Sequence, residues 1–270
     1  YYFEKKALKA EGFNLNTIFS IVNGKQIQEE RNRLMGEMNI AKEIQTSIVP
    51  KTIELDGYKV ACGMETATEV GGDAYDFIKT KYGNYFSIGD VSGHGLPSGI
   101  TALIFLSSLQ AALETSEVLD AKLDVDKAYD IINRVLCTIN RDRIGSDKFM
   151  TSNVFKEKDG LFEYAGAHEV AVQYVSKDNK IVEHKGCTEK TAFLGLSEHI
   201  RSESSKGQLT MESGDILVLY SDGVIEAKDK DAVQYGMERL DNLVLANKDK
   251  EPGEILEIIK ADVYAYAKDG

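Results

Sequence analysis

The apolar pattern of this chain changes at Pro50, and this change limits what the two parts of the chain can fold into. Before Pro50, apolar residues recur every seven positions, at Ile27, Leu34, Ala41 and Ile48. This repeat predicts a helix over residues 27–49, and Pro50 ends it because proline cannot continue a helix. Beyond Pro50 the apolar positions mostly alternate, and a period of two is typical of β-strands.

The predicted helix has two interpretations: it packs on its own domain, or it is a dimerising linker that carries a signal. Arg31 and Gln45 interrupt the second position of the apolar seam, so a coiled coil formed here is short and imperfect. The chain starts at Tyr1 without methionine, and we expect a sensor domain upstream. We therefore divide it into residues 1–45, an N-terminal segment with a helical regulatory or dimerisation linker, and residues 46–270, a second domain.

The remainder of the chain predicts strands and helices in separate groups. The predicted strands are residues 58–62, 84–88, 151–155, 161–165, 170–175, 180–183 and 215–220. The predicted helices are residues 97–115, 124–140, 236–246 and 253–267. Residues 215–220 are almost continuously apolar, as expected of a strand buried on both faces. Antiparallel strands with helices grouped between them predict an α+β sandwich.

Charge and cysteine content exclude some classes of function. The chain carries 44 acidic and 32 basic residues, a formal net charge of −12, and shows no basic stripe of the kind that binds nucleic acid. Cys62, Cys137 and Cys187 are far apart and odd in number, which argues against a cysteine metal site or a disulfide framework. We expect reduced thiols in a reducing compartment.

Three aspartates share one local pattern, in which small or apolar residues lead to the acid and the chain then turns. They are Asp73, Asp90 and Asp222. A carboxylate at the end of a buried strand is costly to desolvate unless it is paired or binds a cation, and no lysine or arginine adjoins any of the three in sequence. Oxygen ligands select hard ions such as Mg²⁺ or Mn²⁺. Aspartate beside glycine is also ordinary turn chemistry, so metal binding and turn formation both stay open.

The glycines around the second of these aspartates point to unusual backbone there. Gly89 precedes Asp90, and Gly93 and Gly95 follow it. Glycine permits positive φ angles and close approach of the backbone to a ligand. A main-chain carbonyl just after Asp90 could therefore serve as a metal ligand itself.

Several motifs in register identify a family. VGGDAYDF, GDVSGHGLPS, YAGAHE, FLGL and LYSDGVIEA, with the lead-in MNIAKEIQTSIVP, resemble the bacterial SpoIIE/RsbU-type serine phosphatases, of the metal-dependent, protein phosphatase 2C-like (PPM) group. The resemblance runs from about Glu37 to the C-terminus. It implies a four-layer α/β/β/α sandwich of two antiparallel sheets flanked by helices, with a metal site at one edge.

The resemblance also implies roles for particular residues. Asp90 would bridge two ions, Mn²⁺ or Mg²⁺, with the backbone carbonyl of Val91 as a further ligand. Asp73 and Asp222 would complete the coordination shells, partly through water. His94 would either donate a proton to the leaving serine oxygen or only hydrogen-bond the glycine loop; histidine in general is a suitable proton donor near neutral pH.

The sequence departs from the family pattern in two places. The family continues past its last helix into an aspartate-bearing strand, whereas this chain stops at residues 268–270, so we expect the domain to lack its last strand. The motif AGAHEVAV replaces a version richer in glycine and proline, and here we expect His168 to secure a turn between strands.

The family's activity is removal of phosphate from serine or threonine of partner proteins, commonly anti-sigma-factor antagonists. The leading hypothesis is such a phosphatase, controlled through the 27–49 helix, which could also form a homodimer. The alternatives are a catalytically weak or inactive module that binds a partner, and a hydrolase of small phosphoesters, although no P-loop pattern is present. With no signal peptide or long apolar span recognised, we expect a cytoplasmic protein or the cytoplasmic part of a membrane-attached sensor.

Overall fold

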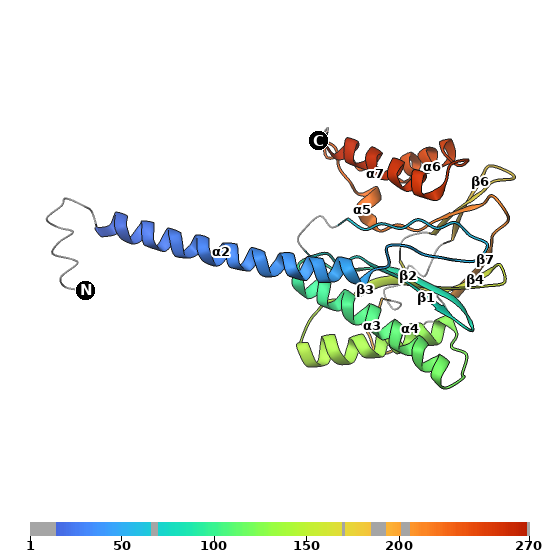
Figure 1. Ribbon diagram of the computed structural model, residues 1–270, viewed down its shortest axis with the longest axis horizontal. Helices are drawn as coiled ribbons and strands as arrows, with labels where there is room; N and C mark the ends of the chain where they lie inside the picture. The colour runs from blue at the N-terminus through green and yellow to red at the C-terminus, as the bar shows by residue number, and fades with distance from the viewer. Residues whose placement is uncertain (1–14, 66–69, 169–170, 185–192, 201–205, 269–270) are drawn as a thin grey trace.

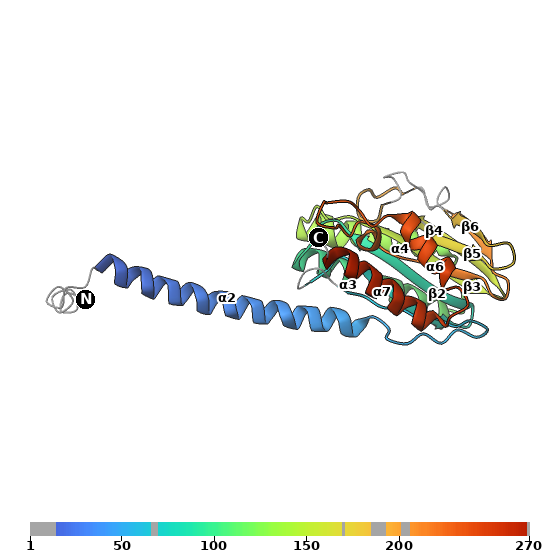
Figure 2. The same cartoon turned by 90° about the horizontal axis from the view of Figure 1, so that it is seen from above.

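The computed structural model describes residues 15–65, 70–168, 171–184, 193–200 and 206–268. The first element is a long helix, α2 (Leu15–Ile48), which projects away from the rest of the protein (Figures 1 and 2). It begins twelve residues earlier than the predicted start at Ile27 and ends before Pro50, as predicted. Its last turn is already part of the body of the protein, because Gln45 is buried there, as is Val49 just beyond it. The division at residues 45 and 46 stays a prediction.

In the described residues, eight strands form two separate antiparallel sheets. The larger sheet has the order β1-β2-β3-β4-β7, from β1 (Ala74–Thr80), β2 (Gly83–Val91), β3 (Met150–Lys158), β4 (Leu161–Ala167) and β7 (Lys206–Thr210). The smaller sheet has the order β6-β5-β8, from β5 (Ala171–Val175), β6 (Lys180–His184) and β8 (Ile216–Val218). Every pairing in both sheets is antiparallel.

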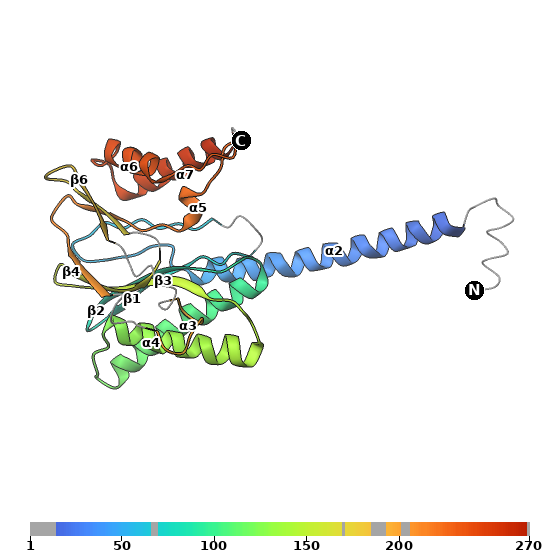
Figure 3. The same cartoon turned by 180° about the vertical axis from the view of Figure 1, so that it is seen from behind.

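Helices cover the outer face of each sheet, as Figures 1 and 3 show. The larger sheet is covered by α3 (Leu96–Val118) and α4 (Val125–Leu136), which continues as a π-helix, η1 (Cys137–Ile144). The smaller sheet is covered by α6 (Met237–Ala246) and α7 (Pro252–Lys268), while the single turn α5 (Asp222–Ile225) follows β8. The predicted four-layer α/β/β/α sandwich is therefore confirmed.

Each gap between two layers holds its own apolar cluster. Phe105 and Ile132 pack between the helices α3 and α4 and the larger sheet. Between the sheets, the rings of Phe86 and Phe155 stack with centroids 4.8 Å apart. Neighbouring side chains on β3 point to opposite faces, so Val154 joins the first cluster and Phe155 the second. Burying one such side chain stabilises the fold by roughly 1.5–3 kcal/mol, so Val154 and Phe155 each hold β3 against a different layer.

A third cluster lies between the smaller sheet and its helices. Tyr174 on β5 packs there with Leu240, Val244 and Ile255. The Tyr174 hydroxyl donates a hydrogen bond of 2.7 Å to Asp241 of α6, so this polar group is satisfied inside the layer. The three clusters together hold the four layers in place.

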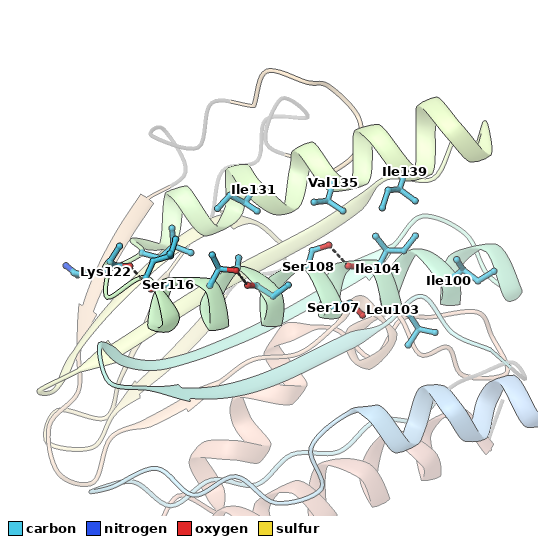
Figure 4. A pocket seen from close by; sticks show the side chains of 16 residues that line it. Ile100, Leu103, Ile104, Ser107, Ser108, Ser116, Lys122, Ile131, Val135 and Ile139 are labelled. Carbon is cyan, nitrogen blue, oxygen red and sulfur yellow. Dashed lines mark hydrogen bonds between the residues drawn. The ribbon is translucent and has the colours of Figure 1, made fainter.

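Helix α3 is apolar over most of its length. By length and composition alone it could cross a membrane, but half of its most apolar window is buried inside the protein. That burial is packing on the larger sheet and on α4. An apolar hollow of about 740 Å³ remains between the two helices, where Ile104 of α3 lies opposite Val135 of α4 and Ile139 of η1 (Figure 4).

Two strand predictions were wrong, and two strands, β1 and β7, were not predicted. Residues 58–62 form no strand and contribute only the isolated bridge between Leu55 and Tyr58. The partner of β2 is instead β1, whose Asp76 and Lys79 hide its alternation. β7 was missed because its sequence, KGQLT, is the polar edge of the sheet. Residues 215–220 were expected to be buried on both faces, yet β8 is a short, half-buried edge strand.

The cysteines agree with the expectation of free thiols where the structure describes them. Cys62 is partly buried and Cys137 is buried, and both thiols are free. Cys187 lies outside the described residues, as does Asp269, the acid next to the end of the chain. The predicted reducing compartment stays a prediction.

Candidate metal centre

The register of the first two strands brings two of the predicted ligands to the same end of the larger sheet. Ala74 at the start of β1 pairs with Gly89 near the end of β2. Because the strands are antiparallel, Asp73, just before Ala74, and Asp90, just after Gly89, meet at this end. The backbone N–H of Val91 donates a 3.2 Å hydrogen bond to the carbonyl of Gly72 and fixes the two segments together.

Gly72 packs directly on the oxygens that were predicted to bind metal. A Cβ atom at this position would lie 2.6 Å from the carbonyl oxygen of Val91 and 2.8 Å from Oδ1 of Asp90. Contacts this short are not tolerated, so only glycine fits. The close approach leaves the Val91 carbonyl and the Asp90 carboxylate side by side, facing the segment that carries Asp73.

Asp222 reaches the same region from the smaller sheet, as the first residue of α5. Burial raises the pKa of Asp73, a hydrogen bond with Ser221 acts against this rise, and the charge of Asp222 adds to it. Oδ1 of Asp73 is buried and has no hydrogen-bond partner in the part of the chain that the structure describes. Two neighbouring carboxylates, one with an unsatisfied buried oxygen, form a site that a divalent cation would stabilise.

These donors suit a hard cation in chemistry, although they do not form a closed cage. Carboxylate and carbonyl oxygens are the ligands that Mg²⁺ prefers, and Mg²⁺ usually keeps several waters. Within the described ranges, no group of three His, Cys, Asp or Glu side chains is close enough together to hold an ion. Asp73 adjoins Asp222, and Gly72 adjoins Asp90 and Val91. Coordination by Asp73, Asp90, Val91 and Asp222 stays a prediction.

The loop after Asp90 has the backbone that the glycines predicted. Gly93 and Gly95 have φ angles of 78° and 84°. The N–H of Phe149, just before β3, donates to the hydroxyl of Ser92 in this loop at 3.1 Å. His94 is exposed on this loop. Its assignment as a proton donor stays a prediction.

His168 lies beside the centre, just after β4. Its Nδ1 is 3.0 Å from the hydroxyl of Thr151, and Thr151 is the strand partner of Asp90. Burial lowers the pKa of His168 to about 4, against the opposing effect of a hydrogen bond with the backbone of Tyr220. His168 is therefore neutral at pH 7, and it joins β3 to the chain that leads into Asp222.

Sequence reasoning missed two residues of this centre, Gly72 and Ser221. Gly72 could have been found, because VGGDAYDF places a second glycine directly before Asp73. Nothing in the sequence around Ser221 indicates a contact with Asp73, since the two residues come from different sheets.

Known proteins are similar to this chain in sequence. A family model described as stage II sporulation protein E (SpoIIE) matches residues 82–270. The phosphoserine phosphatase RsbU of Bacillus subtilis (strain 168) is 27% identical over 207 residues, which are 75% of this chain. The chain spans 56% of the length of that relative.

Solved structures show the same architecture. The SiaA-PP2C domain of Pseudomonas aeruginosa superposes with a TM-score of 0.70 at 16% identity, covering 88% of this chain and 92% of that one. RsbX, solved in complex with magnesium, superposes with a TM-score of 0.52 at 11% identity, covering 81% of this chain and 92% of that one. At such low sequence identities the similarity is evidence for the fold alone. The family model, in contrast, matches most of the chain, and the chain belongs to the SpoIIE family.

Proposed function

We propose that this protein is a metal-dependent protein serine/threonine phosphatase. The observation that supports the proposal is the position of Asp73, which the strand register brings to the same sheet end as Asp90 and whose pKa is raised in part by the charge of Asp222. One buried carboxylate oxygen of Asp73 has no hydrogen-bond partner among the described residues. The similarity to the phosphoserine phosphatase RsbU supports the same activity.

The cofactor is Mn²⁺ or Mg²⁺, and we expect two ions. When bound, such ions lower the pKa of a shared water and neutralise phosphoryl oxygens during in-line attack. The Asp90 carboxylate and the Val91 carbonyl would hold them together with Asp73 and Asp222, partly through water. His94, which is exposed on the loop after Asp90, is the proposed proton donor to the leaving serine oxygen.

The substrate is a phosphorylated partner protein, and an anti-sigma-factor antagonist is the kind of partner that the family suggests. The apolar hollow between α3 and α4 and the one along α2 are lined by residues other than Asp73, Asp90 and Asp222, so neither hollow supplies a small-molecule pocket over the proposed ligands. We place the protein in the cytoplasm, alone or as the cytoplasmic part of a membrane-attached sensor.

Release of phosphate from a phosphoserine protein tests this function. We expect turnover with Mn²⁺, complete loss after chelation, and recovery when Mn²⁺ is added back, because the carboxylates alone cannot activate water at neutral pH. Turnover that survives chelation would overturn the metal mechanism. Calorimetric binding of Mn²⁺ without any turnover would favour the alternative, a phosphatase-fold module that only binds a partner.

We further propose that α2 forms a homodimer, as its heptad pattern predicts. Ile27 and Leu34 are 68% and 49% exposed on the projecting helix. Two copies packed along α2 would remove this apolar surface from water, which is the driving force of a coiled coil. The upstream sensor would act through this helix.

Sedimentation equilibrium of the full chain tests the dimer. We expect twice the monomer mass for the wild type and a shift to monomer for Leu34→Glu, since a charge would be buried in the seam. Asn39→Glu adds the same charge at an exposed polar position of α2 and serves as the matched control. A monomeric wild type at all concentrations would contradict the proposal.

A further inference from the structure

Gln45 is a buried polar residue in the last turn of the exposed helix α2. Its side chain is only 2% exposed, and it makes two hydrogen bonds to one residue, Gly71. Nε2 donates to the Gly71 carbonyl at 2.8 Å, and the Gly71 N–H donates to Oε1 at 3.1 Å. A side-chain amide thus pairs with both backbone groups of Gly71, as a neighbouring strand would. This explains the polar residue that interrupts the apolar seam.

Gly71 leads directly into the predicted metal ligand Asp73. The intervening Gly72 accepts a hydrogen bond from Val91 and packs against Asp90. On the other side, the carbonyl of Val70 accepts a 3.2 Å hydrogen bond from Gly95, at the start of α3. The segment of residues 70–73 therefore runs between the end of β2, the start of α3 and the last turn of α2.

The end of α2 also holds the chain on the far side of Asp73. The Tyr75 hydroxyl donates a 2.9 Å hydrogen bond to the carbonyl of Pro50. Val49 is buried in the same apolar cluster as Ala74. Residues on both sides of Asp73 therefore contact the end of α2 or the residues just after it. Gln45 makes two of these contacts, both hydrogen bonds to Gly71.

We propose that Gln45 is a positioning residue for the metal centre. Its two hydrogen bonds hold Gly71, and through Gly71 they hold the backbone of Asp73, in the place where its carboxylate can bind a cation. The inference rests on the proposed metal-dependent function and adds a physical route from the linker helix to the site. A shift of α2 by one turn would break both hydrogen bonds and leave partly buried backbone groups of Gly71 without these partners.

The test compares Gln45→Met with Gln28→Met in the full chain. Methionine keeps the length and helix propensity of glutamine but cannot form either hydrogen bond. Gln28 is an exposed glutamine of the same helix, and its amide bonds only to Asn32 at 2.9 Å, so it is a matched control. The readouts are the dissociation constant for Mn²⁺ by calorimetry and hydrogen exchange of the Gly71, Gly72 and Asp73 amides.

We expect Gln45→Met to weaken Mn²⁺ binding by about tenfold or more, as the loss of residues that orient metal ligands commonly does. Exchange should be faster at the three amides and unchanged in α7, while the Gln28 variant behaves as wild type. If Gln45→Met does not fold, Gln45→Glu, which keeps the oxygen that accepts from Gly71, takes its place with the same expected direction.

Two results would overturn the proposal. One is wild-type Mn²⁺ affinity and exchange in the Gln45 variant. The other is faster exchange throughout the sandwich, including α7, which would make Gln45 a residue of general stability. A wild-type chain that binds no Mn²⁺ would reject the proposed function instead, whereas the exchange of Gly71 would still report on the contact with Gln45.

Discussion

Replacing Asp90 with asparagine should reduce Mn²⁺-dependent phosphate release by more than about 100-fold. Loss of residues that only orient a metal ligand costs about 10–100-fold, and Asp90 is the proposed bridge between both ions. Asparagine has the same shape but no negative charge, so it cannot balance two cations. Asp90 is half-buried at the end of β2, and the neutral side chain should leave the strand pairing with β3 intact.

The measurement is phosphate release at saturating Mn²⁺, together with thermal unfolding to show that the variant is folded. Asp178→Asn makes the same chemical change in the exposed turn between β5 and β6 and should have no effect. Unchanged turnover in Asp90→Asn would reject the assignment of Asp90, and the predicted metal centre with it.

Replacing Gly72 with alanine should be nearly as damaging, although it removes no ligand. The added methyl group would lie 2.6 Å from the Val91 carbonyl oxygen and 2.8 Å from Oδ1 of Asp90. The carbonyl belongs to the backbone of β2 and cannot move aside as a flexible side chain could. The segment that carries Asp73 must therefore shift away, and a displacement of about 1 Å at a site can cost about 100-fold in rate.

The readouts are Mn²⁺ affinity by calorimetry and phosphate release. Gly253→Ala is the control, because a Cβ at Gly253 meets nothing within 4 Å. Wild-type affinity and turnover in Gly72→Ala would show that Asp73 does not need its present distance from Asp90, and would remove Asp73 from the site.

Much of the fold was predictable because its signals are local. The helices α3, α6 and α7 were predicted to within about three residues at each end, since period and breakers such as Pro97 lie within the segments themselves. The hairpin between β3 and β4 was predicted from Lys158, Asp159 and Gly160, and Asp159 and Gly160 have the positive φ angles that such a turn requires.

The errors fall where strand identity depends on a distant partner. Residues 58–62 have a strand-like composition but pair with no neighbouring strand among the described residues, beyond the isolated bridge of Tyr58 to Leu55. β7 is polar and becomes a strand only by pairing with β4. In the same way, β8 is apolar yet half-buried, because its place at the edge of the smaller sheet leaves it one neighbour. Propensity cannot distinguish these cases, since the pairing decides which of them forms a strand.

The sequence alone was enough to propose the donors of the predicted metal centre, each an acid that follows small or apolar residues, and to identify the family. It did not determine that Gly72 must be glycine, that Ser221 bonds to Asp73, or that Gln45 holds Gly71. Gln45 and Gly71 are 26 positions apart in the chain, and Asp73 and Ser221 come from opposite sheets of the sandwich. Only the packing of the layers brings such atoms within reach, because hydrogen bonds and steric contacts act over a few ångströms whatever the separation along the chain.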